Sequence, residues 1–442
     1  MADALADNPP VQLHEYGAAV VLSVEEVDLS AIIEANSRWK RALNLPNDPI
    51  RIVDVSHSRV SLRAEGVTGV VRAGRTEIQI SPKFLSSSVG SWQSVLWRIL
   101  SVVEGGYVDE GLSSAQESAL PMPDLLAEIF LTSYQKGAAR GLPRGYVTKC
   151  STGRTLRGSL DLSRIGEWLI APWDIPYTSD VLTDDTALSR LLRWAADTLS
   201  TAVKSPDRSH ALREIVANLS HVSRRPPHLI DAQRLELGTQ HQGLEAARLV
   251  GVLLLDGAGV EHSRGEHKLS GFLWKSDLIY ENYIYWLSGR AAAKLGLRVS
   301  KQAVAFGKLI AGEGRRLETI PDVVFRSRDG TVAAVTDSKY KVLGTRPKSS
   351  DTYQVLTAGH VLGCSRVSLT YPVSVPRDAT VWRVQSALGG DDIELTALPL
   401  NLMCLAQPNG PDVLVEKIVA WLSAAVEGEK HVTLEASEIY EP

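Results

Sequence analysis

Two aspartates and a lysine in the C-terminal third of the chain have the types and spacing of a metal-dependent hydrolytic site. Asp322 follows Pro321, and Asp337 lies fifteen residues further on in the run Asp337-Ser338-Lys339. Hard divalent cations such as Mg²⁺ prefer carboxylate oxygens and can lower the pKa of a bound water. A lysine beside that water can orient it or help to deprotonate it. These groups suit the hydrolysis of a phosphodiester, in which charge develops on the phosphate oxygens.

The segment between the two aspartates predicts the structure that brings them together. Residues 323–336 form two apolar, β-branched runs joined by Asp329-Gly330, a dipeptide typical of hairpin turns. Both aspartates then lie at one end of the hairpin, and strand alternation points Asp337 and Lys339 to the same face. An ordinary surface hairpin with solvated charges would show the same residues. The apolar run 332–335, typical of a buried strand, favours the first interpretation because it leads directly into Asp337.

A helix is predicted upstream of the hairpin. Residues 278–287 have apolar side chains at helical spacing, namely Leu278 with Tyr285 and Ile284 with Leu287, and they contain Glu281. Glu281 is either a third carboxylate offered to the metal or a solvent-facing helix residue.

A second helix and a strand are predicted downstream. Residues 351–358 indicate a helix capped by Ser350 or Asp351, and residues 367–372 indicate a strand that Pro372 ends. The order helix, hairpin, helix, strand describes a compact α/β catalytic core.

The fold class expected for the whole chain is α/β (α+β overall), in three parts. Residues 1–115 form a β-rich N-terminal domain, residues 116–270 a mixed region of helices and strands, and residues 271–442 the α/β core. The clearest elements outside the core are strands at 50–55 and 76–81, helices at 92–104, 123–141, 186–203 and 242–255, short strands within 146–162, and a proline-rich loop at 223–227.

Composition narrows the classes of protein that this chain can be. It has 442 residues, 44% hydrophobic and 22% charged, which indicates a globular protein of two or three domains. A net charge of −4 argues against coating nucleic acid by bulk electrostatics, so a DNA-cutting chain needs local basic patches or a partner that brings the DNA. Three cysteines favour a reducing compartment, and no signal-peptide pattern or run of transmembrane length is present, so we expect a soluble, cytoplasmic protein with no membrane partner.

Known nucleotide-binding and histidine metal motifs are missing from the sequence. It has no GxxxxGK[ST] phosphate loop, so the chain is not itself a nucleotide-driven motor. It has no HxxxH or HExxH pair, which argues against a histidine metallohydrolase.

The C-terminal part resembles the PD-(D/E)xK nuclease superfamily, and nearly the whole chain resembles the McrC family, the nuclease subunits of type IV restriction systems that depend on modified cytosine. The core segments that carry the resemblance are Tyr280-Glu281-Asn282-Tyr283, Pro321-Asp322, Asp337-Ser338-Lys339-Tyr340-Lys341, Asp351-Thr352-Tyr353-Gln354 and Leu369-Thr370-Tyr371-Pro372. Further matches are Ile80-Ser81-Pro82-Lys83, Leu156-Arg157-Gly158-Ser159-Leu160-Asp161 and Leu188-Ser189-Arg190-Leu191-Leu192. The chain departs from the family at Ser189, where Asn is common, and at Ala358, where Tyr is common.

Together the residues and the resemblance imply a metal-dependent DNA endonuclease with a restriction-endonuclease-like core. Asp322 and Asp337 are expected to hold Mg²⁺, with Mn²⁺ as the alternative cofactor, and Glu281 to assist as a third metal ligand. Lys339 is expected to position the attacking water, and Gln354 to orient these groups or a phosphate.

The resemblance also implies partners. They are a McrB-like AAA+ GTPase hexamer, which the N-terminal domain engages and whose GTP hydrolysis the chain stimulates, and DNA carrying methylated cytosine. Two alternatives stay open: a structural activator of the AAA+ ring whose nuclease site is idle, and a stand-alone repair nuclease that uses the same fold without a GTPase.

Overall fold

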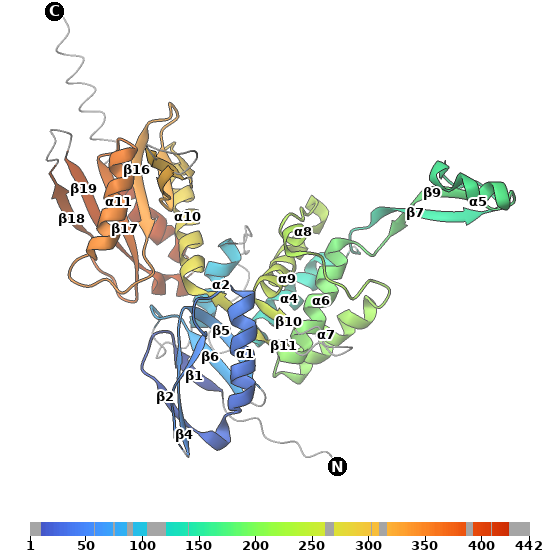
Figure 1. The fold of residues 1–442 in the computed structure, drawn as a ribbon, viewed down its shortest axis with the longest axis horizontal. Coiled ribbons are helices and arrows are strands. Elements are labelled where there is room, and N and C mark those ends of the chain that lie inside the picture. Colours follow the sequence, from blue (N-terminus) through green and yellow to red (C-terminus); the bar gives the residue numbers. More distant parts are fainter. Residues whose placement is uncertain are drawn as a thin grey trace, which may run out of the picture. The chain divides into compact units, whose positions relative to one another are not determined.

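The computed structural model describes residues 10–56, 58–73, 76–85, 92–103, 121–139, 141–260, 269–301, 303–308, 316–385, 392–407 and 409–423. They form helices and several sheets, which confirms the predicted α+β class (Figure 1). The chain divides into two compact units, one made of Met1–Met122 and Ser270–Pro442 and the other of Pro123–Leu269. The expected N-terminal domain and catalytic core therefore share one unit, while the three-part division itself stays a prediction.

In its described residues, the N-terminal lobe of the first unit contains short strands, two α-helices and a short 3-10 helix. Its elements are β1 (Val11–His14), β2 (Val20–Ser23), η1 (Val24–Glu26), α1 (Leu29–Ala42), β3 (Ile50–Val55), β4 (Arg59–Ala64), β5 (Val67–Ala73), β6 (Thr76–Ser81) and α2 (Trp92–Val103). The strands predicted at 50–55 and 76–81 are confirmed, and so is the helix from residue 92, although Glu104 lies outside the described residues. Helix α1 was not predicted. It buries Ile32, Ala35 and Trp39, whose spacing is that of a helical face, in the core of the lobe.

One sheet of the lobe presents its strand ends toward the C-terminal domain. Strand β1 pairs in parallel with β6, β6 pairs with β5, and β5 pairs with β11 (Leu269–Lys275), both antiparallel. The carboxyl ends of parallel strands lie at the same edge of a sheet, and an antiparallel neighbour starts at that edge. The residues that follow β1, β6 and β11 and that precede β5 therefore share one edge, and helix α10 (Ser276–Lys294) begins there.

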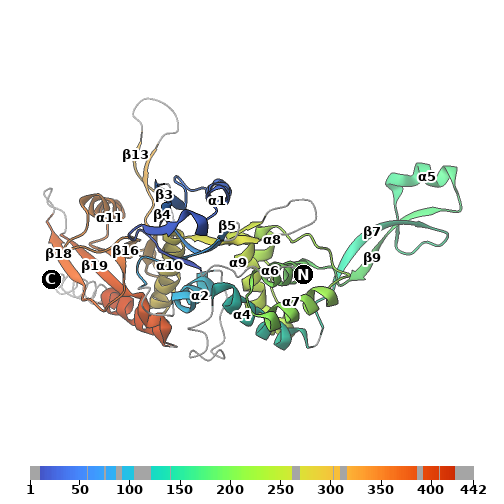
Figure 2. The ribbon, with the colours of Figure 1, turned by 90° about the horizontal axis from the view of Figure 1, so that it is seen from below.

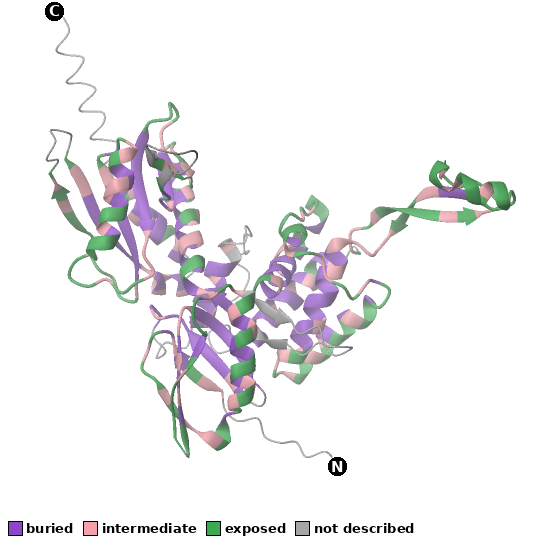
Figure 3. Ribbon diagram, viewed as in Figure 1, coloured by how far each residue is buried: buried purple, intermediate pink, exposed green. Residues whose placement is uncertain are grey.

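The C-terminal domain is built on a six-stranded sheet. Its other elements are β12 (Arg298–Ser300), β13 (Val304–Lys308), β14 (Arg316–Thr319), β15 (Val323–Arg326), β16 (Val332–Ser338), α11 (Ser349–Val361), β17 (Arg366–Val373), β18 (Thr380–Val384), β19 (Ile393–Asn401), η4 (Leu402–Ala406) and a helix at 410–423. The strand order is β12-β15-β16-β17-β19-β18, with β16, β17 and β19 parallel to one another. Strands β15, β16 and β17 are buried along most of their length (Figure 3), as the apolar run at 332–335 predicted.

The predicted order of elements in the core is confirmed. Helix α10 precedes the β15–β16 hairpin, whose strands pair antiparallel, and α11 and β17 follow. Helix α11 packs against β16 and β17 through a shared apolar cluster that includes Val335, Val355 and Val367. The hairpin is therefore fixed on its neighbours by both strand pairing and apolar packing.

The helix predicted at 278–287 is confirmed as part of α10, in which Ile284 and Leu287 are buried while Leu278 and Tyr285 are exposed. Two other local predictions for the core were wrong. Helix α11 begins at Ser349, and neither Ser350 nor Asp351 caps it. Strand β17 continues through Pro372, which stays paired with β19. Pairing with β16 has already ended at Thr370, so the missing N–H of proline breaks no bond on that side.

The second unit consists mainly of helices. Its elements are α4 (Met122–Ala138), β7 (Gly145–Gly153), β8 (Ser159–Leu160), η2 (Leu162–Arg164), α5 (Ile165–Ile170), β9 (Ile175–Thr183), α6 (Ala187–Ala202), α7 (Pro206–Asn218), α8 (Leu229–Gln233), η3 (Thr239–Leu244), α9 (Glu245–Gly257) and β10 (Ala258–Val260). The helices predicted at 123–141, 186–203 and 242–255 correspond to α4, α6 and α9, and the segment 223–227 forms no helix or strand, as expected. A long hairpin of β7 and β9 extends from these helices (Figure 2).

None of the helices found in the described ranges combines the length and the apolar character that crossing a membrane requires.

The pairing of β5 with β11 requires a glycine at position 69. Gly69 has φ +134°, and a Cβ there would lie 2.0 Å from the carbonyl oxygen of Phe272 on β11. We expect Gly69→Ala to lower the free energy of unfolding by about 2–4 kcal/mol, since backbone strain and a clash with main chain combine. Chemical denaturation measures this. Gly344→Ala, where the nearest atom lies at 3.8 Å, is the control; equal effects of the two changes would contradict the role of Gly69.

Candidate active site

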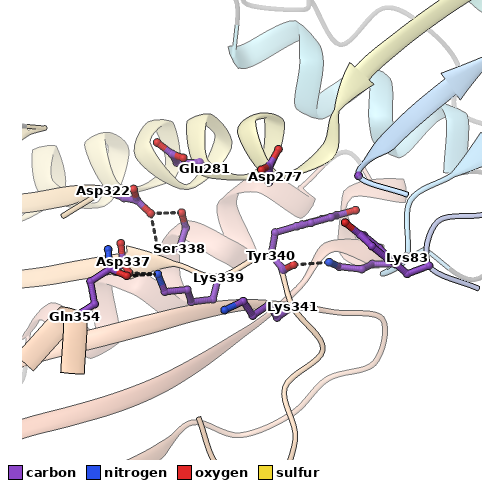
Figure 4. A pocket seen from close by; sticks show the side chains of 12 residues that line it. Lys83, Asp277, Glu281, Asp322, Asp337, Ser338, Lys339, Tyr340, Lys341 and Gln354 are labelled. Atoms are coloured by element: carbon purple, nitrogen blue, oxygen red, sulfur yellow. Dashed lines mark hydrogen bonds and ion pairs between the residues drawn. The ribbon is translucent and has the colours of Figure 1, made fainter. Parts of the chain in front are cut away.

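The structure brings four of the five predicted site residues together at one end of the β15–β16 hairpin. Asp322 directly precedes β15, and Asp337 lies near the end of the neighbouring strand. The Lys339 ammonium forms an ion pair with Asp337 and donates a hydrogen bond to Gln354 Oε1 at 2.9 Å (Figure 4). Gln354 comes from α11, so strand and helix hold the lysine between them.

The end of the hairpin is locked by Ser338. One oxygen of Asp322, Oδ2, accepts a hydrogen bond from the Ser338 backbone N–H at 2.7 Å and another from the Ser338 hydroxyl. These bonds cross between the two strands, and they hold the Asp322 carboxylate beside Asp337 (Figure 4). Sequence reasoning assigned no role to Ser338, because the residue between Asp337 and Lys339 points away from them along the strand.

The electrostatics of the two aspartates favour a bound cation. Asp337 is 2% exposed, and its burial, together with the neighbouring charge of Asp322, raises its pKa to about 6, while Lys339 acts in the opposite direction. Apart from its ion pair with Lys339, Oδ2 of Asp337 has no hydrogen-bond partner in the described part of the chain. Mg²⁺ is usually bound by one or two carboxylates and keeps several waters. The pair Asp322 and Asp337 therefore fits such an ion.

Glu281 lies in the same pocket but does not join the aspartates. It comes from α10, and its carboxylate is paired with Lys301. Across the ranges that the structure describes, no three His, Cys, Asp or Glu side chains lie close enough to hold a metal ion together. The arrangement is a site of two carboxylates, and the role of Glu281 as a third metal ligand stays a prediction.

A second lysine fixes the helix that carries Gln354. Lys341 donates hydrogen bonds to both carboxylate oxygens of Asp351, at 2.7 and 3.0 Å, and Asp351 is buried in the first turn of α11. Residues three apart on a helix share a face, so this anchor also aligns Gln354 toward Lys339. Asp351, which was expected to cap the helix, instead forms an ion pair with Lys341 in the segment that follows β16.

The pocket around these groups has a volume of about 360 Å³ and includes residues that sequence reasoning missed. Besides the five predicted residues, it is lined by Tyr16, Gly66, Lys83, Asp277, Ser338, Tyr340 and Lys341. Tyr16, Gly66 and Lys83 come from the N-terminal lobe, at the edge where its strands end. The one signal for them in the sequence is the segment Ile80-Ser81-Pro82-Lys83, which ends on Lys83.

A buried glutamate of the lobe lies behind the pocket. Glu15 has no exposed surface, and it accepts hydrogen bonds from the Tyr340 hydroxyl and from the Lys83 backbone N–H, the latter at 3.3 Å. Burial raises the pKa of Glu15 to about 7, although the hydrogen bond from Tyr340 and the charge of Lys83 act in the opposite direction. Glu15 therefore changes its charge near neutral pH.

Comparisons with known proteins find a matching family model and solved structures with a similar fold. Residues 62–372 match the family model described as McrBC 5-methylcytosine restriction system component. No curated protein matches the chain. Among solved structures, the chain resembles one in the refined half-complex from a tetradecameric assembly of Thermococcus gammatolerans McrB AAA+ hexamers with bound McrC. That match has a TM-score of 0.60 and 14% identity, and it covers 93% of this chain and 99% of the other.

A chain of the cryo-EM structure of the Thermococcus gammatolerans McrBC complex also matches. It has a TM-score of 0.45 and 16% identity, over 64% of this chain and 88% of the other. At 14% identity, the first likeness shows a shared fold.

The raised pKa of Glu15 makes stability depend on pH. Between pH 4.5 and 7 the folded chain holds a proton on Glu15 that the unfolded chain releases, so the free energy of unfolding falls as pH rises through this range, by up to about 3 kcal/mol. Glu15→Gln does not titrate. Its stability relative to the unmodified chain should therefore rise from pH 4.5 to 7, as urea denaturation at several pH values can measure. A constant difference would contradict this, and the exposed Glu25→Gln is the control.

Proposed function

The chain belongs to the family of McrBC 5-methylcytosine restriction system components, and on this premise we propose that it is a Mg²⁺-dependent DNA endonuclease subunit. The observation that carries the proposal is the buried Asp337, with the partly exposed Asp322 and with Lys339 held beside it. Two carboxylates that can bind a divalent ion and a lysine beside them support hydrolysis of a phosphodiester as the reaction.

Each side chain of the site has its own role in the proposed reaction. Asp322 and Asp337 would hold Mg²⁺, or Mn²⁺, which accepts the same oxygen ligands. Such an ion, when bound, offsets negative charge on the phosphate oxygens and acidifies a bound water. Lys339 orients the attacking water, and the bond to Gln354 keeps its ammonium in one position. Lys341 also lines the pocket, and its positive charge suits an anionic backbone.

We propose a McrB-like AAA+ GTPase hexamer as the partner, with DNA carrying methylated cytosine as the substrate. The support is the family membership and the fold shared with a chain of the McrB assembly with bound McrC. A net charge of −4 and a sequence without a phosphate loop fit a chain that depends on another protein for nucleotide hydrolysis and for delivery of DNA. The alternatives are an activator of the ring with an idle nuclease site and a stand-alone repair nuclease. The arrangement of Asp322, Asp337 and Lys339 favours an active site over an idle one.

Removing the proposed metal ligand or the lysine should separate cleavage from partner activation. We expect Asp337→Ala and Lys339→Ala each to lower Mg²⁺-dependent cleavage of methylated plasmid DNA by at least about 10²-fold. Stimulation of the partner's GTP hydrolysis should persist, because both side chains lie inside the pocket. Asp329→Ala, in the exposed hairpin turn, is the control. Cleavage that survives Asp337→Ala would refute the site, and a native protein that never cleaves with its partner would favour the activator.

Gln354 should matter through the oxygen that Lys339 contacts. Gln354→Met removes that acceptor at similar size, and we expect the cleavage rate to fall about tenfold, since one hydrogen bond to a charged group is lost. Gln354→Glu keeps an oxygen at the same place and should retain more activity than Gln354→Met. Single-turnover rates of the two variants test this, and equal rates would show that the contact is incidental.

A further inference from the structure

Tyr340 joins the proposed catalytic strand to the N-terminal lobe. It directly follows Lys339, and its ring packs edge-on against Phe84 of the lobe, with 5.4 Å between ring centroids. On another side it packs against Tyr280 of α10, at 5.8 Å. The two neighbouring side chains make different contacts, because the Lys339 ammonium binds Asp337 and Gln354 while the Tyr340 ring packs on Phe84 of the lobe.

Glu15 and Lys83 of the lobe bind the two polar groups of Tyr340, its phenol hydroxyl and its backbone carbonyl. Glu15 accepts the hydrogen bond of the phenol, and the Lys83 ammonium donates to the Tyr340 backbone carbonyl (Figure 4). The same ammonium lies 3.7 Å from the centroid of the Tyr340 ring, within the range of a cation–π interaction. Side chain and main chain of Tyr340 are therefore both held by residues more than 250 positions away in the sequence.

The lobe keeps a strained residue at this contact. Tyr16 has φ +56°, an uncommon conformation for a bulky side chain that costs free energy and persists only where the surroundings impose it. Its ring lines the pocket, and the Lys83 ammonium lies 4.9 Å from the ring centroid. Burial also lowers the pKa of Lys83, while Glu15 and Asp277 act in the opposite direction. A partly desolvated cation between two aromatic rings and a carbonyl is held in one place.

We propose that the N-terminal lobe is part of the nuclease centre, in which Glu15 and Lys83 are positioning residues that hold Tyr340 and, through it, Lys339. The proposal presupposes the nuclease function proposed above. Lys339 is fixed on one side by its backbone N–H, which donates to Thr370 O at 2.8 Å. The next regular element begins only at Ser349, and before it the chain is held by Tyr340, which directly follows Lys339, and by the ion pair of Lys341 with Asp351. Without the contacts of Tyr340, Lys339 loses its alignment with Asp337.

The proposal predicts a loss of rate without a loss of binding. We expect Lys83→Met and Glu15→Leu to lower the single-turnover rate of Mg²⁺-dependent cleavage of 5-methylcytosine plasmid DNA, with the GTPase partner present, by about 10²-fold, because misplacing a catalytic group by about 1 Å has effects of that size. The DNA concentration at half-maximal rate should not change. Lys83→Arg keeps a hydrogen-bond donor for Tyr340 and Glu15→Gln keeps an acceptor. Both variants should cleave DNA at a single-turnover rate within about threefold of that of the unmodified chain. Lys40→Met, at a half-exposed lysine of α1 that pairs with Asp48, is the control.

A second measurement does not depend on cleavage. Hydrogen–deuterium exchange of the metal-free full chain should show the amides of Lys339 and Lys341 exchanging at least about tenfold faster in Lys83→Met and Glu15→Leu, because the local opening of this segment becomes easier. The control Lys40→Met should leave both amides unchanged. Tyr340→Phe keeps the packed ring and loses only the bond to Glu15, so it gives the same test on a chain that keeps its core, with an effect of about tenfold on the cleavage rate.

The outcomes distinguish this inference from the proposed function. If Asp337→Ala abolishes cleavage while Lys83→Met and Glu15→Leu cut normally and exchange normally, the nuclease assignment stands and the positioning role is refuted. A higher half-maximal DNA concentration at an unchanged rate would make Lys83 a DNA contact, which also refutes it. If the unmodified chain cuts no DNA, the proposed function fails, and the exchange of Lys339 and Lys341 alone decides whether the lobe positions this segment.

Discussion

The buried carboxylate of Asp337 is the constraint on which this pocket depends. Removing a carboxylate from water beside a second one, Asp322, costs free energy unless positive charge lies close by. Lys339 supplies one such charge, and the raised pKa of Asp337 indicates that this one cation does not offset the burial fully. A divalent ion bound by Asp322 and Asp337 would supply the positive charge that Lys339 alone does not. The burial of Asp337 would therefore strengthen the binding of that ion. The desolvation that disfavours the empty pair thus favours the occupied one.

Two sheets of the first unit place the pocket residues at the ends of their strands. In the C-terminal domain, β16 buries Asp337 because β15 and β17 flank it on either side, and the ladder ends close to Lys339. In the lobe, β1 and β6 run parallel, so Glu15 and Lys83 leave the sheet at one edge. Polar groups just beyond the end of a strand are not used in strand pairing, and the strand still holds them at a defined position. Two rigid sheets therefore place the pocket groups, and the side chains need little freedom of their own.

How much of this could be predicted from the sequence depends on the distance between the interacting residues. The hairpin, its turn at Asp329-Gly330 and the convergence of Asp322 with Asp337 follow from local patterns within about twenty residues. The cap expected at Asp351 was wrong because its carboxylate gains more from the Lys341 ion pair, a contact that local propensity does not contain. Lys83 and Glu15 reach Tyr340 across 257 and 325 positions, and no periodicity in one sequence encodes such a pairing.

The contacts of Glu15 and Lys83 with Tyr340 connect the N-terminal lobe to the segment that carries Lys339. The lobe that sequence resemblance assigns to partner binding also holds Tyr340 through Glu15 and Lys83, so a force on the lobe acts on the main chain beside Lys339. Packed interfaces of this kind tend to have discrete arrangements instead of deforming continuously, since buried polar pairs are either made or broken. Partner binding that favours the made arrangement by only about 1.4 kcal/mol would raise the population ratio of made to broken tenfold. Under the proposed function, a change in how firmly the lobe holds Tyr340 would therefore be enough to control cleavage, without movement of Asp322 or Asp337.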